Sequence, residues 1–274
     1  MTSQPTVTLN DGHVMPQLGL GVWQTPPEEA AEVVKTAIEA GYRHVDTAAA
    51  YRNERGVGEG LQSAGQEGVF ITTKLWNDNQ GYDATLTAFD KSLARLGLPA
   101  IDLYLIHWPA PNRGLYLDSW KALVRLKEEG RARSIGVSNF KQEHLERIIG
   151  ETGLTPAVNQ VELHPSFQQK QLREFHQAHG ILTESWSPLG QGQQLADPTV
   201  LALAAKHGRK PAQVVIRWHL QSGLIVIPKS VTPSRIRENI AVFDFALGAD
   251  DMAALAALDR PNGRIGPDPS TATF

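Results

Sequence analysis

Polar side chains stand at the ends of several short apolar runs in this sequence, where they could act together on one substrate. Asp46, Lys74 and His107 each end or directly follow such a run, and Tyr51 lies in the stretch after the first. A buried strand holds the side chain at its end rigidly and presents it at the rim of a sheet. Several such ends in succession therefore predict one shared active site.

These four residue types suit the delivery of a proton to a carbonyl oxygen. A free phenol has a pKa near 10, and a cation within roughly 4 to 6 Å lowers the pKa of an acid by about 1 to 3 units. We therefore expect Lys74 to lower the pKa of Tyr51 and Asp46 to keep that lysine charged and oriented, while His107 donates a hydrogen bond to a substrate oxygen. No side chain donates hydride, so a reduction completed in this way requires a cofactor.

The elements that would position these residues alternate along the chain. Short apolar runs predict eight strands, and stretches of helical period separate them. The predicted strands are 18–22, 44–46, 69–74, 101–106, 134–138, 157–161, 181–186 and 224–228. Strands that are apolar on both faces and alternate with helices favour an α/β fold closed into a (β/α)8 TIM barrel, with 1–274 as a single domain.

Turn and cap signals add detail to this barrel. Asp11-Gly12 lies between two segments of alternating polarity, 7–9 and 13–16, and predicts an N-terminal hairpin that closes the bottom of the barrel. An open doubly wound sheet would instead call for a Gly-x-Gly-x-x-Gly turn, which the sequence lacks. Helix starts are predicted by a capping box at 25–28 and by N-caps at 197 and 232, each followed by proline.

Composition excludes several classes of protein. The net charge of −3 over 274 residues gives no field that would attract nucleic acid or an anionic membrane, and the absence of cysteine removes thiolate and cysteine-ligated metal chemistry. His176 and His179 have helical spacing, but no carboxylate motif surrounds them, so we expect surface residues of a helix and no metal. Neither an export signal nor a membrane span is indicated, which predicts a cytoplasmic protein.

Four motifs resemble the signatures of the aldo-keto reductase superfamily. They are GYRHVDTAAAYRNE at 41–54, IDLYLIHWP at 101–109, SIGVSNF at 134–140 and IPKS at 227–230. The motifs occur in the family's order and span the chain, and the sequence resembles the bacterial 2,5-diketo-D-gluconate reductases most. The resemblance implies NADPH-dependent carbonyl reduction on a (β/α)8 barrel with Tyr51 as proton donor.

The resemblance also implies a cofactor site. Ser138, Asn139 and Gln160 would bind the nicotinamide carboxamide, and Trp186, where many relatives have tyrosine, would stack on the nicotinamide ring. The remaining residues implied to contact the cofactor are Ser187, Leu189, Lys229, Ser230, Val231, Arg235, Glu238 and Asn239.

Charge and helix geometry support a phosphate site in the last part of this set. Lys229 and Ser230 end the final predicted strand, and Arg235 falls in the first turn of the helix that Thr232 and Pro233 open. A helix N-terminus beside a lysine, a hydroxyl and an arginine suits a phosphate, which favours NADPH over NADH. Thr232 and Pro233 replace arginines of some bacterial relatives, so fewer positive charges support the preference for NADPH over NADH.

Aromatic residues predict the substrate pocket. Trp23, Trp76 and Trp108 each follow a predicted strand end on the catalytic side, where the family has its pocket aromatics. The loop after Trp108 and the tail beyond Arg260 are short. A shallow aromatic site predicts small polar carbonyls: 2,5-diketo-D-gluconate, methylglyoxal or other dicarbonyls, β-keto esters and sugar aldehydes.

Two other functions fit parts of the sequence. A barrel hydrolase with paired carboxylates would need a second acid at a strand end, whereas Glu184 lies inside its predicted strand. A nucleotide-binding regulatory or structural barrel with little turnover would have no need of all four polar residues. We therefore expect an enzyme, which by its family resemblance would be a monomer with a small-molecule carbonyl substrate.

Overall fold

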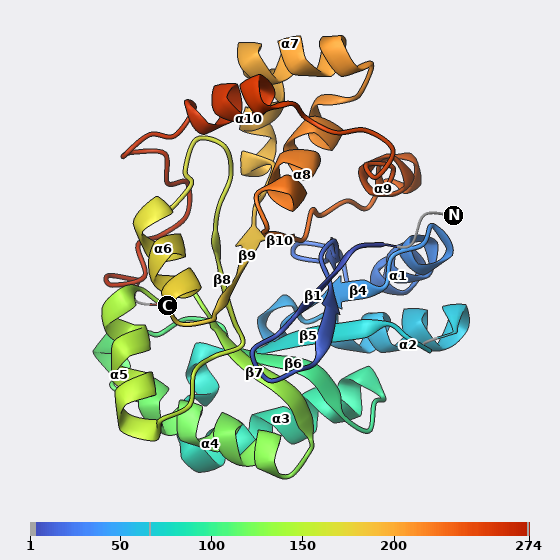
Figure 1. The fold of residues 1–274 in the computed structure, drawn as a ribbon. Helices are drawn as coiled ribbons and strands as arrows, with labels where there is room; N and C mark the ends of the chain where they lie inside the picture. The colour runs from blue at the N-terminus through green and yellow to red at the C-terminus, as the bar shows by residue number, and fades with distance from the viewer. Residues whose placement is uncertain (1–3, 66, 273) are drawn as a thin grey trace.

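A closed barrel of eight parallel strands forms the centre of the computed structural model, which describes residues 4–65, 67–272 and 274. The order of the strands in the sheet follows their order along the chain, as Figure 1 shows. They are β3 (Leu20–Gly21), β4 (His44–Asp46), β5 (Phe70–Leu75), β6 (Ile101–Ile106), β7 (Ala132–Ser138), β8 (Val158–Glu162), β9 (Leu182–Trp186) and β10 (Ile225–Val226). Parallel bridges from Leu18 to Val226 and from Gly21 to Lys229 close the sheet, which confirms the predicted TIM barrel.

The N-terminal hairpin closes one end of the barrel, as predicted. Its strands are β1 (Thr6–Thr8) and β2 (Val14–Pro16), which pair antiparallel. Leu9 and Met15 of this segment are buried in one cluster with Leu103 and Leu105 from inside the barrel. The hairpin therefore contributes apolar side chains to the barrel core and leaves the opposite end, where the strands have their carboxyl ends, open for chemistry.

Ten α-helices surround the barrel in the described part of the chain. They are α1 (Ala30–Glu39), α2 (Glu54–Ala64), α3 (Tyr82–Leu96), α4 (Tyr116–Glu128), α5 (Gln142–Thr152), α6 (Lys170–Ala178), α7 (Pro198–His207), α8 (Pro211–Gln221), α9 (Pro233–Ile240) and α10 (Ala249–Ala256). Helices α7 and α10 lie outside the β-then-α alternation, near α8 (Figure 1). The three helices share a second core cluster, in which Trp218 is buried. Four short 3-10 turns, η1 (Ala49–Tyr51), η2 (Asn77–Asn79), η3 (Pro111–Arg113) and η4 (Gly190–Ala196), occur in loops after strands.

One detail of the helices differs from the predictions. The capping box at Thr25 does not form: α1 begins at Ala30, and the Thr25 hydroxyl is buried without a hydrogen-bond partner among the described residues. The backbone N–H of Glu29 bonds instead to the carbonyl of Pro26, so a turn precedes the helix. By contrast, the Asp197 side chain accepts hydrogen bonds from the first turn of α7, which confirms that cap.

His176 is buried, so its prediction as a surface residue is wrong. Its ring nitrogens lie 2.9 Å from Asn159 Nδ2 and 2.8 Å from Thr183 Oγ1, and burial lowers its pKa to about 3. Since Asn159 and Thr183 come from the neighbouring barrel strands, local sequence around α6 did not reveal them. His179 is exposed, as expected.

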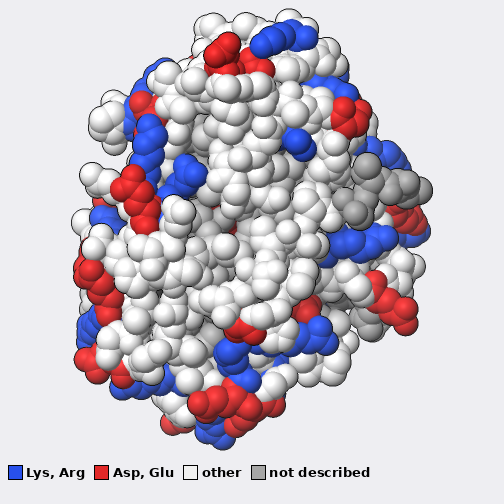
Figure 2. Space-filling view, viewed as in Figure 1, with Lys and Arg blue, Asp and Glu red and all other residues white. Residues whose placement is uncertain are grey.

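On the face that Figure 2 shows, positive and negative side chains are interspersed, and neither sign forms a large patch. Within the residues that the structure describes, no helix is long and apolar enough to cross a membrane. The same residues contain no group of three or more histidine, aspartate or glutamate side chains placed to hold a metal ion.

Candidate active site

The parallel strands bring the four predicted catalytic residues to one end of the barrel. Asp46 is the last residue of β4, and His107 follows directly after β6. Lys74 is the penultimate residue of β5, because this strand continues one residue further than predicted. Tyr51 reaches the same place from η1, the short turn that follows β4.

A buried ion pair lies at the centre of this group. Lys74 Nζ is 2.6 Å from Asp46 Oδ1 and donates a second hydrogen bond to the carbonyl of Thr47 at 2.9 Å. The same nitrogen lies 5.2 Å from the centre of the Tyr51 ring, and the rings of Tyr51 and His107 meet edge to face at 5.6 Å. One cation is therefore held against the phenol by two oxygen acceptors.

Burial changes the proton affinities of these groups. Removal from water raises the pKa of Tyr51, and although the charge of Lys74 acts to lower it, the pKa stays above its ordinary value. The prediction that Lys74 would bring about a net lowering is therefore wrong, because the desolvation of a phenolate outweighs one nearby cation here. Burial and Lys74 lower the pKa of His107 well below its usual range, so this imidazole is neutral at physiological pH.

A cavity of about 340 Å³ opens above these side chains. Twelve of the predicted site residues line it: Trp23, Asp46, Tyr51, Trp76, His107, Trp108, Ser138, Asn139, Gln160, Trp186, Ser187 and Lys229. Lys74 has no exposed surface and lies beneath the cavity. His107 lines the cavity, and its Nδ1 atom is buried without a hydrogen-bond partner among the described residues.

Hydrogen bonds orient the side chains on the far wall of the cavity. The indole nitrogen of Trp186 donates to Asn139 Oδ1 at 2.8 Å, and Asn139 Nδ2 donates to the carbonyl of His107 at 3.0 Å. Asn139 has a positive φ of 63°, which turns the chain sharply at the end of β7. Ser138 donates to the backbone carbonyl of Gln160 at 2.8 Å. A flat indole and two side-chain amides thus face one cavity.

The remaining predicted cofactor residues do not line this cavity. Leu189 contacts the core clusters, while Ser230, Val231, Arg235, Glu238 and Asn239 lie at or within α9 and the residues before it. Arg235 and Lys229 are exposed, and Ser230 Oγ accepts a hydrogen bond from the backbone of Thr232 at 3.1 Å. Ser230, Val231 and Arg235 therefore lie at the N-terminal end of α9, and Glu238 and Asn239 lie in its last turn.

The C-terminal segment supplies a wall that the sequence analysis missed. Glu162, at the end of β8, accepts hydrogen bonds from the backbone N–H groups of Ile265 at 2.6 Å and Gly266 at 2.8 Å. Beyond this anchor, the ring of Phe274 stacks on Trp76, with centroids 5.7 Å apart and an interplanar angle of 5°. Gly266, Pro267 and Phe274 all line the cavity. A short tail can reach the site because one buried carboxylate fixes its course.

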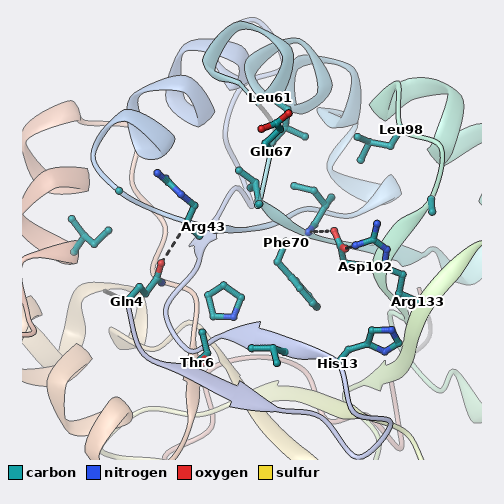
Figure 3. Close-up of a pocket in the computed structure, with 18 of the residues that line it drawn as sticks. Gln4, Thr6, His13, Arg43, Leu61, Glu67, Phe70, Leu98, Asp102 and Arg133 are labelled. Atoms are coloured by element: carbon teal, nitrogen blue, oxygen red, sulfur yellow. Dashed lines mark hydrogen bonds and ion pairs between the residues drawn. The ribbon is translucent and has the colours of Figure 1, made fainter. Parts of the chain in front are cut away.

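A larger cavity of about 1140 Å³ lies at the opposite end of the barrel, beside the hairpin (Figure 3). Three of its charged groups, Arg43, Asp102 and Arg133, are already used within the fold. Asp102 accepts hydrogen bonds from the backbone of Ile71 and from Arg133, and Arg43 donates to the carbonyls of Ile38 and Tyr42. The smaller cavity, which is lined by a histidine and by a tyrosine beside a lysine, is the better candidate for chemistry.

Comparisons with known proteins agree with this geometry. The sequence is 53% identical over 273 residues to methylglyoxal reductase DkgA of Escherichia coli strain K12, covering 98% of each chain, and 56% identical over 272 residues to an aldo-keto reductase of Mycolicibacterium smegmatis, again covering 98% of each. The fold superposes on the crystal structure of apo Gox0644 with a TM-score of 0.97 and 61% identity, covering 99% of each chain, and a mutant of Gox0644 in complex with NADPH also gives 0.97, with 60% identity. Residues 15–260 match the model of the aldo/keto reductase family, so the chain belongs to this family of oxidoreductases.

Proposed function

We propose that this protein reduces aldehyde and ketone carbonyls to alcohols with NADPH, and that Tyr51 is the general acid. One observation carries the proposal: a buried Lys74–Asp46 ion pair is held against the tyrosine ring beside a neutral histidine at the base of an aromatic cavity. Proton donation by a positioned side chain typically increases the rate by about 10² to 10⁴. A gain of this size would explain why the fold keeps these polar side chains buried despite the free energy lost on their desolvation.

The residues of the cavity suit a nicotinamide. The Trp186 indole offers a flat apolar surface, and the side-chain amide oxygens of Asn139 and Gln160 can accept hydrogen bonds from the N–H groups of a carboxamide. Because about 340 Å³ is too small for a whole dinucleotide, the adenine end would lie outside it, and Lys229, Ser230 and Arg235 near the start of α9 suit its 2′-phosphate. Bound NADPH would supply the hydride that no side chain can provide.

The chain's own groups would then hold the carbonyl and move one proton. His107 would donate a hydrogen bond to the carbonyl oxygen, since it lines the cavity and its neutral ring carries one N–H. Tyr51 would donate its phenolic proton to the same oxygen as negative charge develops there. Lys74, fixed by Asp46, would stabilise the phenolate that remains.

Small polar carbonyls fit the cavity best. Trp23, Trp76, Trp108 and Phe274 form its aromatic walls, and the tail closes one side of it. We propose methylglyoxal and other dicarbonyls, 2,5-diketo-D-gluconate, β-keto esters and sugar aldehydes as substrates; the relationship to the DkgA reductases supports the first of these. Much faster turnover of steroids than of small dicarbonyls would contradict this choice.

The Tyr51→Phe variant tests the mechanism. Because the hydroxyl serves proton transfer, reduction of methylglyoxal should fall by at least about 10²-fold while NADPH affinity, measured by quenching of tryptophan fluorescence, changes little. Retained activity would refute the role of Tyr51. Tight NADPH binding by the wild type with no turnover of any carbonyl would instead favour the regulatory or structural alternative.

We further propose that residues 1–274 act as one domain and as a monomer. The barrel and its hairpin share one apolar interior, so separate unfolding of the two is not expected. A single unfolding transition, together with a sedimentation coefficient for a 30.0 kDa particle, would agree with this proposal.

A further inference from the structure

Glu184 is a buried carboxyl group for which the proposed proton transfer has no use. It lies in the middle of β9 without exposed surface, and its Oε2 accepts a hydrogen bond from Gln160 Nε2 at 2.9 Å. The same nitrogen donates to Asp46 Oδ2 at 2.8 Å, so the two N–H groups of one amide connect two carboxyl groups. The Oε1 atom of Glu184 has no hydrogen-bond partner in the described part of the chain.

The groups that face Glu184 include a single cation among the described residues. They are His44 and Asp46 from β4, Lys74 from β5, Gln160 from β8 and Tyr51 from η1, while the β10 residue paired with Glu184 is Ile225. Lys74 is already paired with Asp46 at 2.6 Å. His44 is neutral, because burial lowers its pKa to about 3.

A second negative charge in this interior would therefore have no partner. Since an unpaired buried carboxylate is strongly disfavoured, Glu184 keeps its proton at neutral pH. Burial, together with the charge of Asp46, raises its pKa to about 8. When Glu184 does ionise, its charge acts to raise the pKa of both Tyr51 and Lys74.

We propose that Glu184 is a positioning residue whose carboxyl group, connected to Asp46 through Gln160, controls how firmly Tyr51 holds its proton. This inference rests on the proposed function, because it takes Tyr51 as the group that exchanges the proton. A neutral Glu184 leaves the phenol free to give up its proton, whereas an ionised Glu184 opposes the phenolate. The residue thus restrains the reverse reaction at alkaline pH.

The reverse reaction shows the effect most clearly. In alcohol oxidation, the alcohol O–H proton passes to the Tyr51 phenolate while the hydride on its carbon passes to NADP⁺, so the rate follows the fraction of Tyr51 that is deprotonated. A charge that raises the pKa of Tyr51 lowers this fraction, and an ionised Glu184 acts in that direction. The change sets in as pH rises through about 8, where Glu184 ionises.

The Glu184→Gln variant removes the titration and keeps the shape of the side chain. The probe is acetol, the alcohol formed when the aldehyde carbon of methylglyoxal is reduced, with NADP⁺ from pH 6 to 10. The ratio of the E184Q rate to the wild-type rate should be constant at pH 6 to 7 and should rise several-fold between roughly pH 7.5 and 9.5. A purely structural role would change the ratio equally at every pH.

Ser185→Ala is the matched control. Ser185 is the next residue of β9, is equally buried, has an unpartnered hydroxyl within the described residues and carries no charge. Its ratio to the wild type should stay constant over the whole pH range. A step in the S185A ratio like that of E184Q would overturn the proposal, because the step would then follow from disturbing the strand.

An infrared titration of the wild type decides the protonation state without any variant, and it also serves if E184Q does not fold. With ¹³C-labelled glutamate, a carbonyl band of a protonated carboxylic acid should be present at pH 7 and disappear with a midpoint near pH 8. Its absence at pH 7, or a constant rate ratio for folded E184Q, would overturn the inference. A wild type that reduces no carbonyl would contradict the proposed function, whereas a constant ratio in an active enzyme would contradict only the role of Glu184.

Discussion

Replacing Lys74 by methionine should destabilise the fold in a way that depends on pH. Methionine has a similar length but no charge, so the change leaves the Asp46 carboxylate buried without its cation. In the wild type the two side chains are buried and 2.6 Å apart. Removing one partner of such a pair costs about 3 to 5 kcal/mol, and in a domain of this size that corresponds to a lower Tm by roughly 6 to 20 °C.

The pH dependence follows from the carboxyl that remains. Without Lys74, burial would hold the pKa of Asp46 above its unfolded value of about 3.9. A group with a raised folded-state pKa favours the folded state at low pH, and this contribution is lost as pH rises through the folded pKa. The loss of stability in Lys74→Met should therefore be largest at pH 8 and should shrink towards pH 5.

Urea unfolding followed by circular dichroism at pH 5 and pH 8 measures both effects. The double variant Asp46→Asn with Lys74→Met removes both charges and should recover most of the lost stability. Lys35→Met is the control, because Lys35 forms an exposed pair with Glu39 at 4.0 Å, where the same substitution should cost at most about 0.5 kcal/mol. Equal losses in the single and double variants, or a loss independent of pH, would refute the view that an unpaired buried charge is the cause.

Three further substitutions test other parts of the structure. Arg235→Ala should weaken NADPH binding far more than NADH binding, as measured by fluorescence titration, and equal losses would remove Arg235 from the phosphate site. Phe274→Ala removes a ring stacked on Trp76, so kcat/KM for phenylglyoxal relative to methylglyoxal should rise by about tenfold, and an unchanged ratio would show that the ring does not limit substrate size. In the wild type the pKa of His176 is lowered to about 3, so the contribution of its neutral ring to stability is complete above pH 6.5 and is lost as the pH falls towards 3. His176→Asn should therefore reduce the slope of unfolding free energy against pH in this range by up to about 1.4 kcal/mol per pH unit. An unchanged slope in urea unfolding would contradict this prediction.

The sequence predicted the barrel closely, because its strands are buried on both faces. Largely apolar runs such as 101–106 indicate where a strand lies, and that strand has the predicted bounds. The hairpin was predicted from Asp11-Gly12 for a similar reason, since a turn depends on neighbouring residues alone. Predictions failed where a residue's partner came from another element, as for His176 with Asn159, or where two prolines allowed a turn in place of the first turn of a helix, as after Thr25.

Some properties of the candidate site could likewise be predicted from the sequence, and others depend on tertiary contacts. The sequence by itself determined which side chains stand at the strand ends, because the position of Asp46, Lys74 and His107 relative to apolar runs is a local property. Only the tertiary structure decided their proton affinities, since the desolvation that raises the pKa of Tyr51 depends on everything packed around it. It also decided the roles of Glu184 and Phe274: one shares an amide with Asp46 and the other stacks on Trp76, and such contacts between residues far apart in the chain exist only once the barrel has closed.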